Sequence, residues 1–211
     1  MFYLVKTPWI LKKLYPSCVW DIKTDDKKVY LTFDDGPQPG ITEFVLDELK
    51  RYKAQATFFC IGKNVIEFPS IYQRILDEGH LVGNHTMNHL NGWKTSDKEY
   101  LENIASASDI IQSRLFRPPY GRITRFQLHQ LSMNRFNLKT IMWSVLSGDF
   151  DETITSEQCY LNVIRNAKAG SIILFHDSQK ASLKIKELLP KVLHYFTQNG
   201  FSFEGIKENA L

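Results

Sequence analysis

Acidic and histidine side chains follow short apolar runs of this sequence, and their types suit metal-assisted hydrolysis. The segment 32–37, TFDDGP, places Asp34 and Asp35 at the end of an apolar run, just before a Gly-Pro turn. The segment 83–89, GNHTMNH, places His85 and His89 four residues apart, which predicts that both imidazoles share one face of a helical turn. Two nitrogens with one or two carboxylate oxygens make a three-ligand metal set with room for water, as in catalytic sites.

Three further segments carry residues that could complete a reaction centre. In FRPPYGR, Arg117 can hold a carboxylate with its forked guanidinium, and the prolines can aim the amide of Tyr120 at a reacting oxygen. In WSVLSGDF, Asp149 follows a predicted strand and could orient a histidine. In IILFHD, His176 ends an apolar strand, where an imidazole can serve as a general acid. Taken singly, these segments also fit a rigid turn, a solvated acid and a core histidine.

The elements that must position these residues alternate between strands and helices. Short apolar and β-branched runs predict strands over 29–33, 56–61, 81–84, 115–117, 140–144, 171–175 and 201–204. This alternation predicts an α/β fold of parallel strands with helical crossovers, either a barrel or an open sheet of about seven strands. In both architectures the loops at the carboxyl ends of the strands hold the functional site.

Helical patterns fill the intervals between these strands. An apolar face runs through residues 41–52. Capping-box patterns, with Glu or Gln three residues after Ser or Thr, predict helix starts at Ser70, Ser96 and Thr155. Pro190 interrupts the last helical pattern and predicts a kink or a break there.

Bulk composition narrows the class of protein. The 211 residues suit a single domain, in which we expect residues 1–28 to pack on a catalytic domain formed by residues 29–211. A net charge of +3 without a Lys/Arg-rich block predicts no nucleic-acid partner. Three cysteines without a CxxC spacing argue against a disulfide framework and favour a reducing compartment.

The first twenty residues show no basic leader or small-residue cleavage site, so we expect a cytoplasmic protein, with export by another route as the alternative. No segment reaches the roughly 18 apolar residues of a membrane span. A second alternative is peripheral contact of the N-terminus with a membrane surface, through Trp9, Ile10, Leu11 and Leu14.

Taken in order, the segments TFDDG, NHTxxH, RPPYG and the LxH of LFH resemble the motif series of one enzyme family. This is the polysaccharide deacetylase family, carbohydrate esterase family four, whose members deacetylate nodulation factors, chitin, peptidoglycan or acetyl-xylan. The resemblance covers residues 29–204. It implies a distorted (β/α) barrel and a hydrolase that removes N-acetyl groups from an N-acetylated sugar or polysaccharide.

The resemblance also implies roles at matching positions. Asp34 would be the general base, and Asp35, His85 and His89 would bind one divalent metal. Two imidazoles and a carboxylate suit Zn²⁺, and Co²⁺ or Ni²⁺ would fit the same ligands.

Further matching positions would complete the reaction centre. Arg117 would steady the base, and Tyr120 would offer its amide to the oxyanion. Leu174 would line the acetyl pocket, and His176 would be the general acid, tuned by Asp149.

Two positions depart from the family pattern. The fourth family motif often reads Asp-x-x-Asp-Trp, whereas here Leu146 replaces the first Asp and Phe150 replaces the Trp. Phe150 can still form an apolar groove wall, so the departures bear on substrate identity more than on chemistry. The alternatives are an O-acetyl carbohydrate esterase or another metallohydrolase and, from a different class, a non-catalytic carbohydrate-binding protein.

Overall fold

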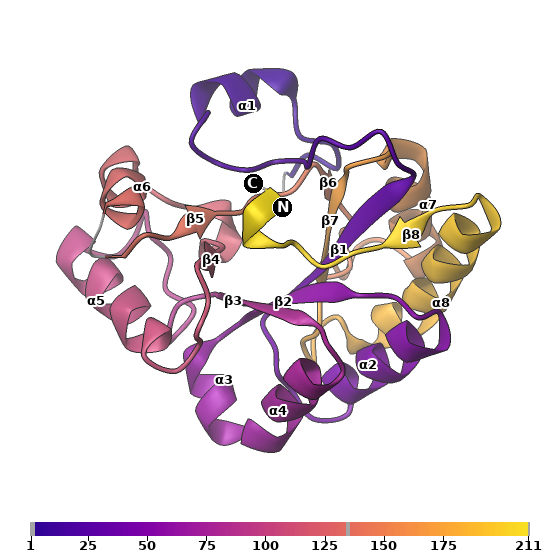
Figure 1. Ribbon diagram of the computed structural model, residues 1–211, viewed down its shortest axis with the longest axis horizontal. Coiled ribbons are helices and arrows are strands. Elements are labelled where there is room, and N and C mark those ends of the chain that lie inside the picture. Colours follow the sequence, from indigo (N-terminus) through magenta and orange to yellow (C-terminus); the bar gives the residue numbers. More distant parts are fainter. Residues whose placement is uncertain (1–2, 134–135, 211) are drawn as a thin grey trace.

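Helices are ranged around a curled parallel sheet in the computed structural model, which describes residues 3–133 and 136–210 (Figure 1). The strands are β1 (Lys28–Asp34), β2 (Ala56–Cys60), β3 (Leu81–Asn84), β4 (Leu115–Phe116), β5 (Lys139–Thr140), β6 (Val145–Leu146), β7 (Ile172–His176) and β8 (Ser202–Phe203). The α-helices are α1 (Trp9–Leu14), α2 (Ile41–Arg51), α3 (Gly62–Glu67), α4 (Pro69–Asp77), α5 (Asp97–Ser108), α6 (Arg125–Ser132), α7 (Ser156–Asn166) and α8 (Ser182–Gln198). Short 3₁₀ turns are η1 (Pro119–Gly121) and η2 (Glu208–Ala210).

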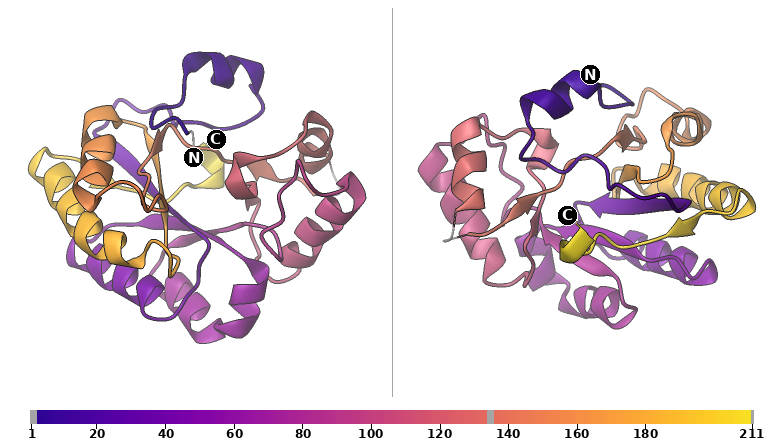
Figure 2. Two further views of the ribbon diagram at one scale, coloured as in Figure 1. Left: turned by 180° about the vertical axis from the view of Figure 1, so that it is seen from behind. Right: turned by 45° about the horizontal axis from the view of Figure 1, so that its top comes forward.

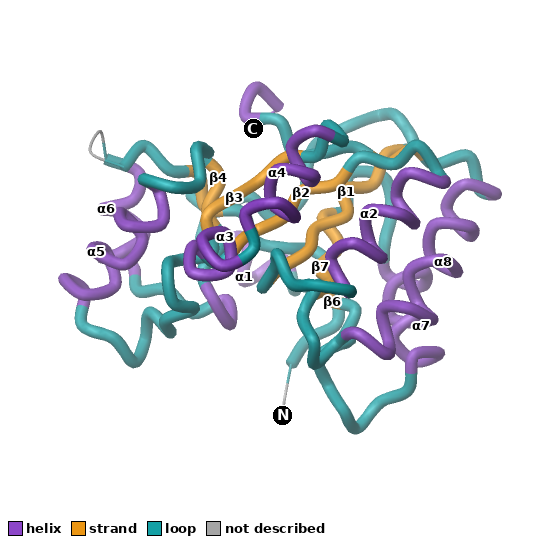
Figure 3. The backbone as a smooth tube through the Cα atoms, turned by 90° about the horizontal axis from the view of Figure 1, so that it is seen from below, coloured by secondary structure: helices purple, strands orange, loops and turns teal. Residues whose placement is uncertain are grey.

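The strands lie side by side in the order β5-β4-β3-β2-β1-β7-β6, and β8 pairs with β1. Every one of these strand pairs is parallel. Figure 3 shows the strands gathered at the centre with helices outside them. The expectation of a distorted (β/α) barrel with about seven parallel strands is confirmed, as a curled half-barrel with β5 and β6 at its edges.

Alternation along β1 decides which side chains reach the interior of the sheet. Leu31 and Phe33 belong to the apolar core that also contains the buried residues of α2 and α8. Tyr30 belongs to a separate core on the other side, and Thr32 and Asp34 share its face because successive strand side chains point to opposite faces. Asp34 therefore points into the curl of the sheet.

The same parity holds for β7. Ile173 and Phe175 pack into the core that contains α2 and α8, whereas Ile172 lies in the inner core. Leu174 and His176 share the inner face with Ile172. Strand β7 is the neighbour of β1, so its inner-face side chains lie beside those of β1.

The single strand expected over 140–144 is wrong. Residues there cross from one edge of the sheet to the other, between β5 and β6. Their main-chain N–H groups bond to different segments in turn: Ile141 to Phe116, Met142 to Val19 and Ser144 to Ile172. The run is apolar because it is buried along this crossing, and burial alone does not distinguish a crossing segment from a strand.

Helix starts and stops follow the predicted chemistry in part. The side chains of Ser96 and Thr155 accept the expected capping hydrogen bonds. Ser70 does not cap, because α4 begins at Pro69, whose fixed backbone suits a first helical turn. Pro190 does not break α8, which runs on through it. Six buried apolar side chains of α8 each contribute about 1.5–3 kcal/mol, which together exceed the roughly 3 kcal/mol cost of an internal proline.

The N-terminal segment runs along the crossing segment and the edge strand β6 (Figure 2). Its isolated β-bridges are Lys6–Val145, Val19–Ile141 and Asp21–Ser171. Helix α1 buries none of its residues, and Trp9, Ile10 and Leu14 are exposed. Within 3–133 and 136–210, none of the helices has the length and apolar character needed to cross a bilayer.

Candidate active site

Chemically active side chains meet where the strands end. Asp34 is the last residue of β1, His85 follows β3, and His176 is the last residue of β7. Asp34 and His176 are direct partners in the register of β1 with β7, so their side chains lie next to each other on the inner face. The parallel arrangement thus gathers residues from distant parts of the sequence at one mouth of the sheet.

Three side chains at this mouth can hold a metal ion. One ligand atom each from Asp35, His85 and His89 lies within 4.8 Å of the others. The Nε2 atom of His89 lies 3.1 Å from Asp35 Oδ1, and Nε2 of His85 lies 3.6 Å from it. Asp35 Oδ1 is buried and accepts no hydrogen bond from the described residues. A buried carboxylate oxygen left without a donor beside two imidazole nitrogens fits a divalent cation.

The two histidines converge, but the expected helical turn between them is wrong. Thr86 and His89 adopt left-handed backbone angles, with φ of 66° and 56°, which end any helix. The amide of Met87 bonds to the side chain of Asn103, in place of a helical carbonyl. The rings still meet, with centroids 5.1 Å apart. The His85 Nδ1 atom hydrogen-bonds the Arg117 carbonyl at 2.7 Å, so Nδ1 is the donor and Nε2 is left to act as a ligand.

The turn that carries Asp35 is held by a residue that the sequence motifs left without a role. Asp177 accepts hydrogen bonds from the Gly36 amide at 3.0 Å and from the Thr42 hydroxyl at 2.6 Å. On the other side, the side chain of Asn64 donates to the Asp35 carbonyl at 2.7 Å. Asp35 itself has φ of 80°, an uncommon angle for a non-glycine residue, and these bonds stabilise it there. The position of Asp177 directly after His176 was the available signal.

Arg117 is fully buried and holds the Asp34 carboxylate in place. Its Nη1 atom donates to Asp34 Oδ1 at 2.7 Å and to the Thr32 hydroxyl at 2.7 Å. The remaining nitrogens donate to the carbonyls of Ile141 and Met142 at 3.1 and 3.0 Å. One oxygen of Asp34 is therefore occupied, and Oδ2, which lies 3.8 Å from His85 Nε2, faces the metal-ligand set.

A second acid holds His176 from behind. Asp149 Oδ1 lies 2.8 Å from His176 Nδ1, and Asp149 Oδ2 accepts the His176 main-chain N–H at 2.7 Å. Asp149 is wholly buried and follows β6, not the strand expected over 140–144. Both oxygens of this carboxylate are thus used to orient one imidazole, which leaves Nε2 of His176 free to exchange a proton.

Comparison with known proteins agrees with this constellation. The family model for polysaccharide deacetylase matches residues 21–137. A peptidoglycan-N-acetylglucosamine deacetylase from Bacillus cereus is 34% identical over 205 residues, covering 93% of this chain and 95% of its own length. The chain belongs to the polysaccharide deacetylase family. The chain is a carbohydrate deacetylase, and its curated relatives are named as deacetylases of peptidoglycan N-acetylglucosamine and of chitooligosaccharides.

Two further relatives of this deacetylase extend the comparison. A chitooligosaccharide deacetylase from Azorhizobium caulinodans is 36% identical over 163 residues, which are 74% of this chain and 76% of that protein. The crystal structure of a peptidoglycan N-acetylglucosamine deacetylase bound to an N-hydroxybenzamide is similar with a TM-score of 0.85 and 31% identity. That match covers 95% of each chain, so the whole fold is shared.

Burial and neighbouring charges shift the pKa values of His85, Asp35 and His176 in different directions. Burial lowers the pKa of His85 to about 4, which keeps this imidazole neutral and able to bind a cation. Burial raises the pKa of Asp35, but the neighbouring His89, His176 and His85 outweigh it and hold that pKa below its usual range. His176 behaves oppositely. Burial lowers its pKa, yet the Asp149 carboxylate outweighs burial and raises it to about 9, so this imidazole is protonated at neutral pH.

The remaining predicted pocket residues also lie around the mouth of the deacetylase. Tyr120 has φ of 59°, and its ring packs edge-on against His89 with centroids 4.6 Å apart. Leu174 is buried on the inner face, in register with Leu146 of β6. The ring of Phe150 packs against His176 at 5.3 Å. The two departures from the family motif therefore both border the site, because Leu146 is the register partner of Leu174 and the Phe150 ring packs on His176.

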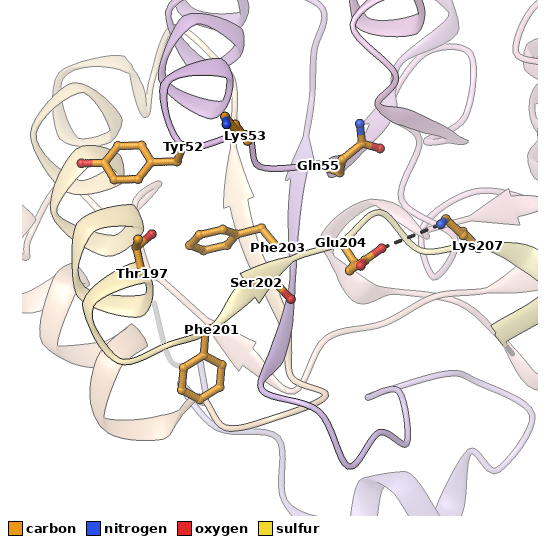
Figure 4. Close-up of a pocket in the computed structure, with 9 residues that line it drawn as sticks. All are labelled: Tyr52, Lys53, Gln55, Thr197, Phe201, Ser202, Phe203, Glu204 and Lys207. Carbon is orange, nitrogen blue, oxygen red and sulfur yellow. Dashed lines mark ion pairs between the residues drawn. The ribbon is translucent and has the colours of Figure 1, made fainter.

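A separate pocket lies away from this site, at the opposite ends of the strands (Figure 4). It is formed where β8 meets the residues that follow α2 and α8, and it contains an ion pair between Glu204 and Lys207 of 3.8 Å. It contains none of the predicted site residues. Its position at the amino ends of the strands separates it from the candidate active site at their carboxyl ends.

Proposed function

We propose that this deacetylase depends on a divalent metal and removes acetyl groups from a polymer that contains N-acetylglucosamine. One observation carries the proposal: a fixed carboxylate, Asp34, stands between a metal-ligand trio and an imidazole poised as an acid. These groups come from the ends of β1, β3 and β7 and face one another at a single mouth.

Asp35, His85 and His89 would hold the metal. When bound, a divalent cation polarises the acetamide carbonyl and makes an attacking water more acidic. The buried Asp35 oxygen without a donor supports this assignment. The crystallised relative gives a second line of support, because it binds an N-hydroxybenzamide, and the two oxygens of an N-hydroxyamide form a chelating pair.

Asp34 serves as the general base. Its Oδ1 is held by Arg117 at 2.7 Å, so the carboxylate cannot rotate freely. The other oxygen, Oδ2, faces the ligand set and takes the proton of the attacking water. A fixed base converts proton removal into a step within one preorganised complex.

His176 serves as the general acid. Its Nδ1 is bonded to Asp149, so Nε2 is the nitrogen that gives a proton to the departing sugar amine. A pKa of about 9 keeps that proton in place at neutral pH until the carbon–nitrogen bond breaks. An amine is a poor leaving group unless it is protonated, so this acid suits an amide more than an ester.

Two pocket features would orient the acetyl group. Tyr120, whose ring packs on His89, would offer its main-chain N–H to the developing oxyanion, an interaction commonly worth about 3 kcal/mol. The buried side chain of Leu174 would contact the acetyl methyl from the inner face of β7. The named relatives act on peptidoglycan N-acetylglucosamine and on chitooligosaccharides, which share N-acetylglucosamine units.

The test measures acetate released by the purified protein from chitooligosaccharides, peptidoglycan glycan strands and an O-acetylated xylan. The protein is stripped of metal and then reloaded with zinc, cobalt or nickel. We expect release only with metal, a preference for the N-acetylated substrates, and loss of turnover without loss of metal in Asp34→Asn. Normal kcat in metal-loaded Asp34→Asn would refute the base, and no release from any N-acetylated sugar would refute the function.

A further inference from the structure

An exposed aromatic residue lies on the segment that follows His89, and its ring is held in place by two contacts. Trp93 lies four residues beyond His89 and is 57% exposed. Its indole Nε1–H donates to the Ile123 carbonyl at 3.0 Å. The guanidinium of Arg122 stacks on the ring, 4.2 Å from its centroid. A ring that is exposed yet fixed at both its edge and its face binds a ligand with little loss of conformational entropy.

The Trp93–Arg122 pair is continuous with the reaction centre on both of its segments. Arg122 follows Tyr120 by two residues, a reach of at most about 7.6 Å between Cα atoms, and Tyr120 packs on His89. Close packing fixes the Trp93 loop against this turn, because a Cβ added at Gly92 would lie 2.6 Å from the Arg122 carbonyl oxygen. The pair therefore lies on the two segments that carry His89 and Tyr120.

No carboxylate among the described residues forms an ion pair with the guanidinium of the Trp93–Arg122 pair. Arg117 and Arg74 pair with carboxylates, whereas Arg122 makes no ion pair with any residue in 3–133 or 136–210. The acid that begins the helix after the Trp93 loop, Asp97, accepts a hydrogen bond from the Gln127 amide. The exposed Lys94 adds a second positive charge on the loop. The Trp93–Arg122 pair thus offers an exposed aromatic surface together with a guanidinium that pairs with no carboxylate of the described residues.

We propose that Trp93 and Arg122 form a subsite for a sugar unit that bears a carboxylate, next to the N-acetylated unit being hydrolysed. The apolar C–H face of the sugar ring packs on the exposed indole surface, and the guanidinium forms a charge-assisted hydrogen bond with the carboxylate. This inference rests on the proposed function and names the class of polymer: an acidic glycan in preference to a neutral one.

The test measures kcat/KM of wild type, Trp93→Ala and Arg122→Gln on three substrates. They are a glycan with lactyl carboxylates on alternate units, its methyl ester, and a neutral chitooligosaccharide of equal length. Trp93→Ala should lower kcat/KM about threefold to tenfold on all three. Arg122→Gln should lower it about fivefold on the carboxylate alone, and high salt should weaken that effect.

Matched controls are present elsewhere in the chain. Trp9 is 66% exposed and carries Lys13 over its ring, outside the site, so Trp9→Ala should leave all three rates unchanged. Arg125→Gln removes an exposed charge from the start of α6 and should likewise have no effect. Metal content of each variant, measured by elemental analysis, shows whether the ligand set is intact.

A binding readout separates this inference from the proposed function. Titration calorimetry with the metal-loaded Asp34→Asn protein measures affinity for the carboxylate glycan and its ester without turnover. Tighter binding of the carboxylate that disappears in Asp34→Asn/Arg122→Gln supports the subsite even if no acetate is released by wild type. Equal binding of carboxylate and ester, or an Arg122→Gln effect on both alike, overturns it while leaving deacetylation untouched.

Discussion

Replacing Asp149 by Asn tests whether the Asp149 carboxylate keeps His176 protonated, so that His176 can act as a general acid. The carboxylate accepts both the main-chain N–H and the Nδ1–H of His176, at 2.7 and 2.8 Å. Asparagine has one oxygen for these two donors, so its amide group must face one of them. The variant thus loses the charge and also leaves a buried donor unpaired, which costs about 1–3 kcal/mol.

The magnitude follows from the pKa of His176, which lies at about 9 instead of its ordinary 6.5. At pH 8 an imidazole with pKa of about 9 is about 90% protonated, and one with pKa 6.5 about 3% protonated, a difference of about thirtyfold. Burial lowers the pKa further once Asp149 is neutral. We therefore expect Asp149→Asn to lose at least about thirtyfold in kcat at pH 8 and less at pH 6.

The assay is acetate release between pH 5 and pH 10 with saturating metal. The alkaline limb of the profile should move from near pH 9 to below pH 7 in Asp149→Asn. Asp151→Asn is the matched control, because it removes a charge two residues away that is not bonded to His176. An unchanged alkaline limb in Asp149→Asn, with metal and fold intact, would refute the assignment of His176 as an acid tuned by Asp149.

The same pair links stability to pH. The folded-state pKa of about 9 exceeds the ordinary value of 6.5, so the protonated pair contributes fully to the free energy of unfolding below pH 6.5. That contribution declines as the pH rises through about 9. Urea unfolding should show this decline in wild type and not in Asp149→Asn, provided that both are measured without metal.

Three other perturbations test the surroundings of the site. Arg117→Lys leaves acceptors of a four-bond buried network unfilled, and we expect a loss of about 3 kcal/mol in urea unfolding; wild-type stability with normal kcat would contradict the role of the guanidinium. Gly36→Ala puts a Cβ 2.0 Å from Asp177 Oδ2, so kcat should fall. If the clash lowers the free energy of unfolding by about 2 kcal/mol, Tm should drop by about 4–8 °C in calorimetry. An unaltered Tm would show that Asp177 does not hold the turn. Zinc at 100 times its Kd should stabilise wild type by about 2.7 kcal/mol, an effect that chelator removes and that His89→Ala lacks, whereas equal stabilisation of His89→Ala would exclude this ligand.

The parts of the site that could be read from sequence are those carried by strand ends. Asp34 and His176 end apolar runs, and parallel pairing alone brings such ends to one edge. The arrangement of the candidate metal ligands was harder to predict, because His85 and His89 meet through left-handed turns at Thr86 and His89, not through a helix. Such backbone angles depend on side chains from distant segments, as when the Asn103 side chain accepts a hydrogen bond from the Met87 amide. The spacing of the two histidines does not predict these angles.

Long-range topology was the other limit. The apolar run over 140–144 has the composition of a strand, yet its hydrogen bonds go to three different segments. Which neighbour a segment pairs with depends on closure of the sheet, and hydrophobic periodicity does not encode that. The role of Asp177 was missed for a similar reason, since its partners Gly36 and Thr42 lie at the start of the chain.

The two-residue parity of β1 and β7 limits how this enzyme can change. Inserting or deleting a single residue within β1 would turn Asp34 toward the helical layer and bring Phe33 or an apolar neighbour to face the substrate. The scaffold therefore resists length changes inside its strands, whereas the segments after the strand ends can grow or shrink without reversing any side chain. Length changes that accompany adaptation to a new polymer are therefore expected in those segments, and their lengths can be compared among family members.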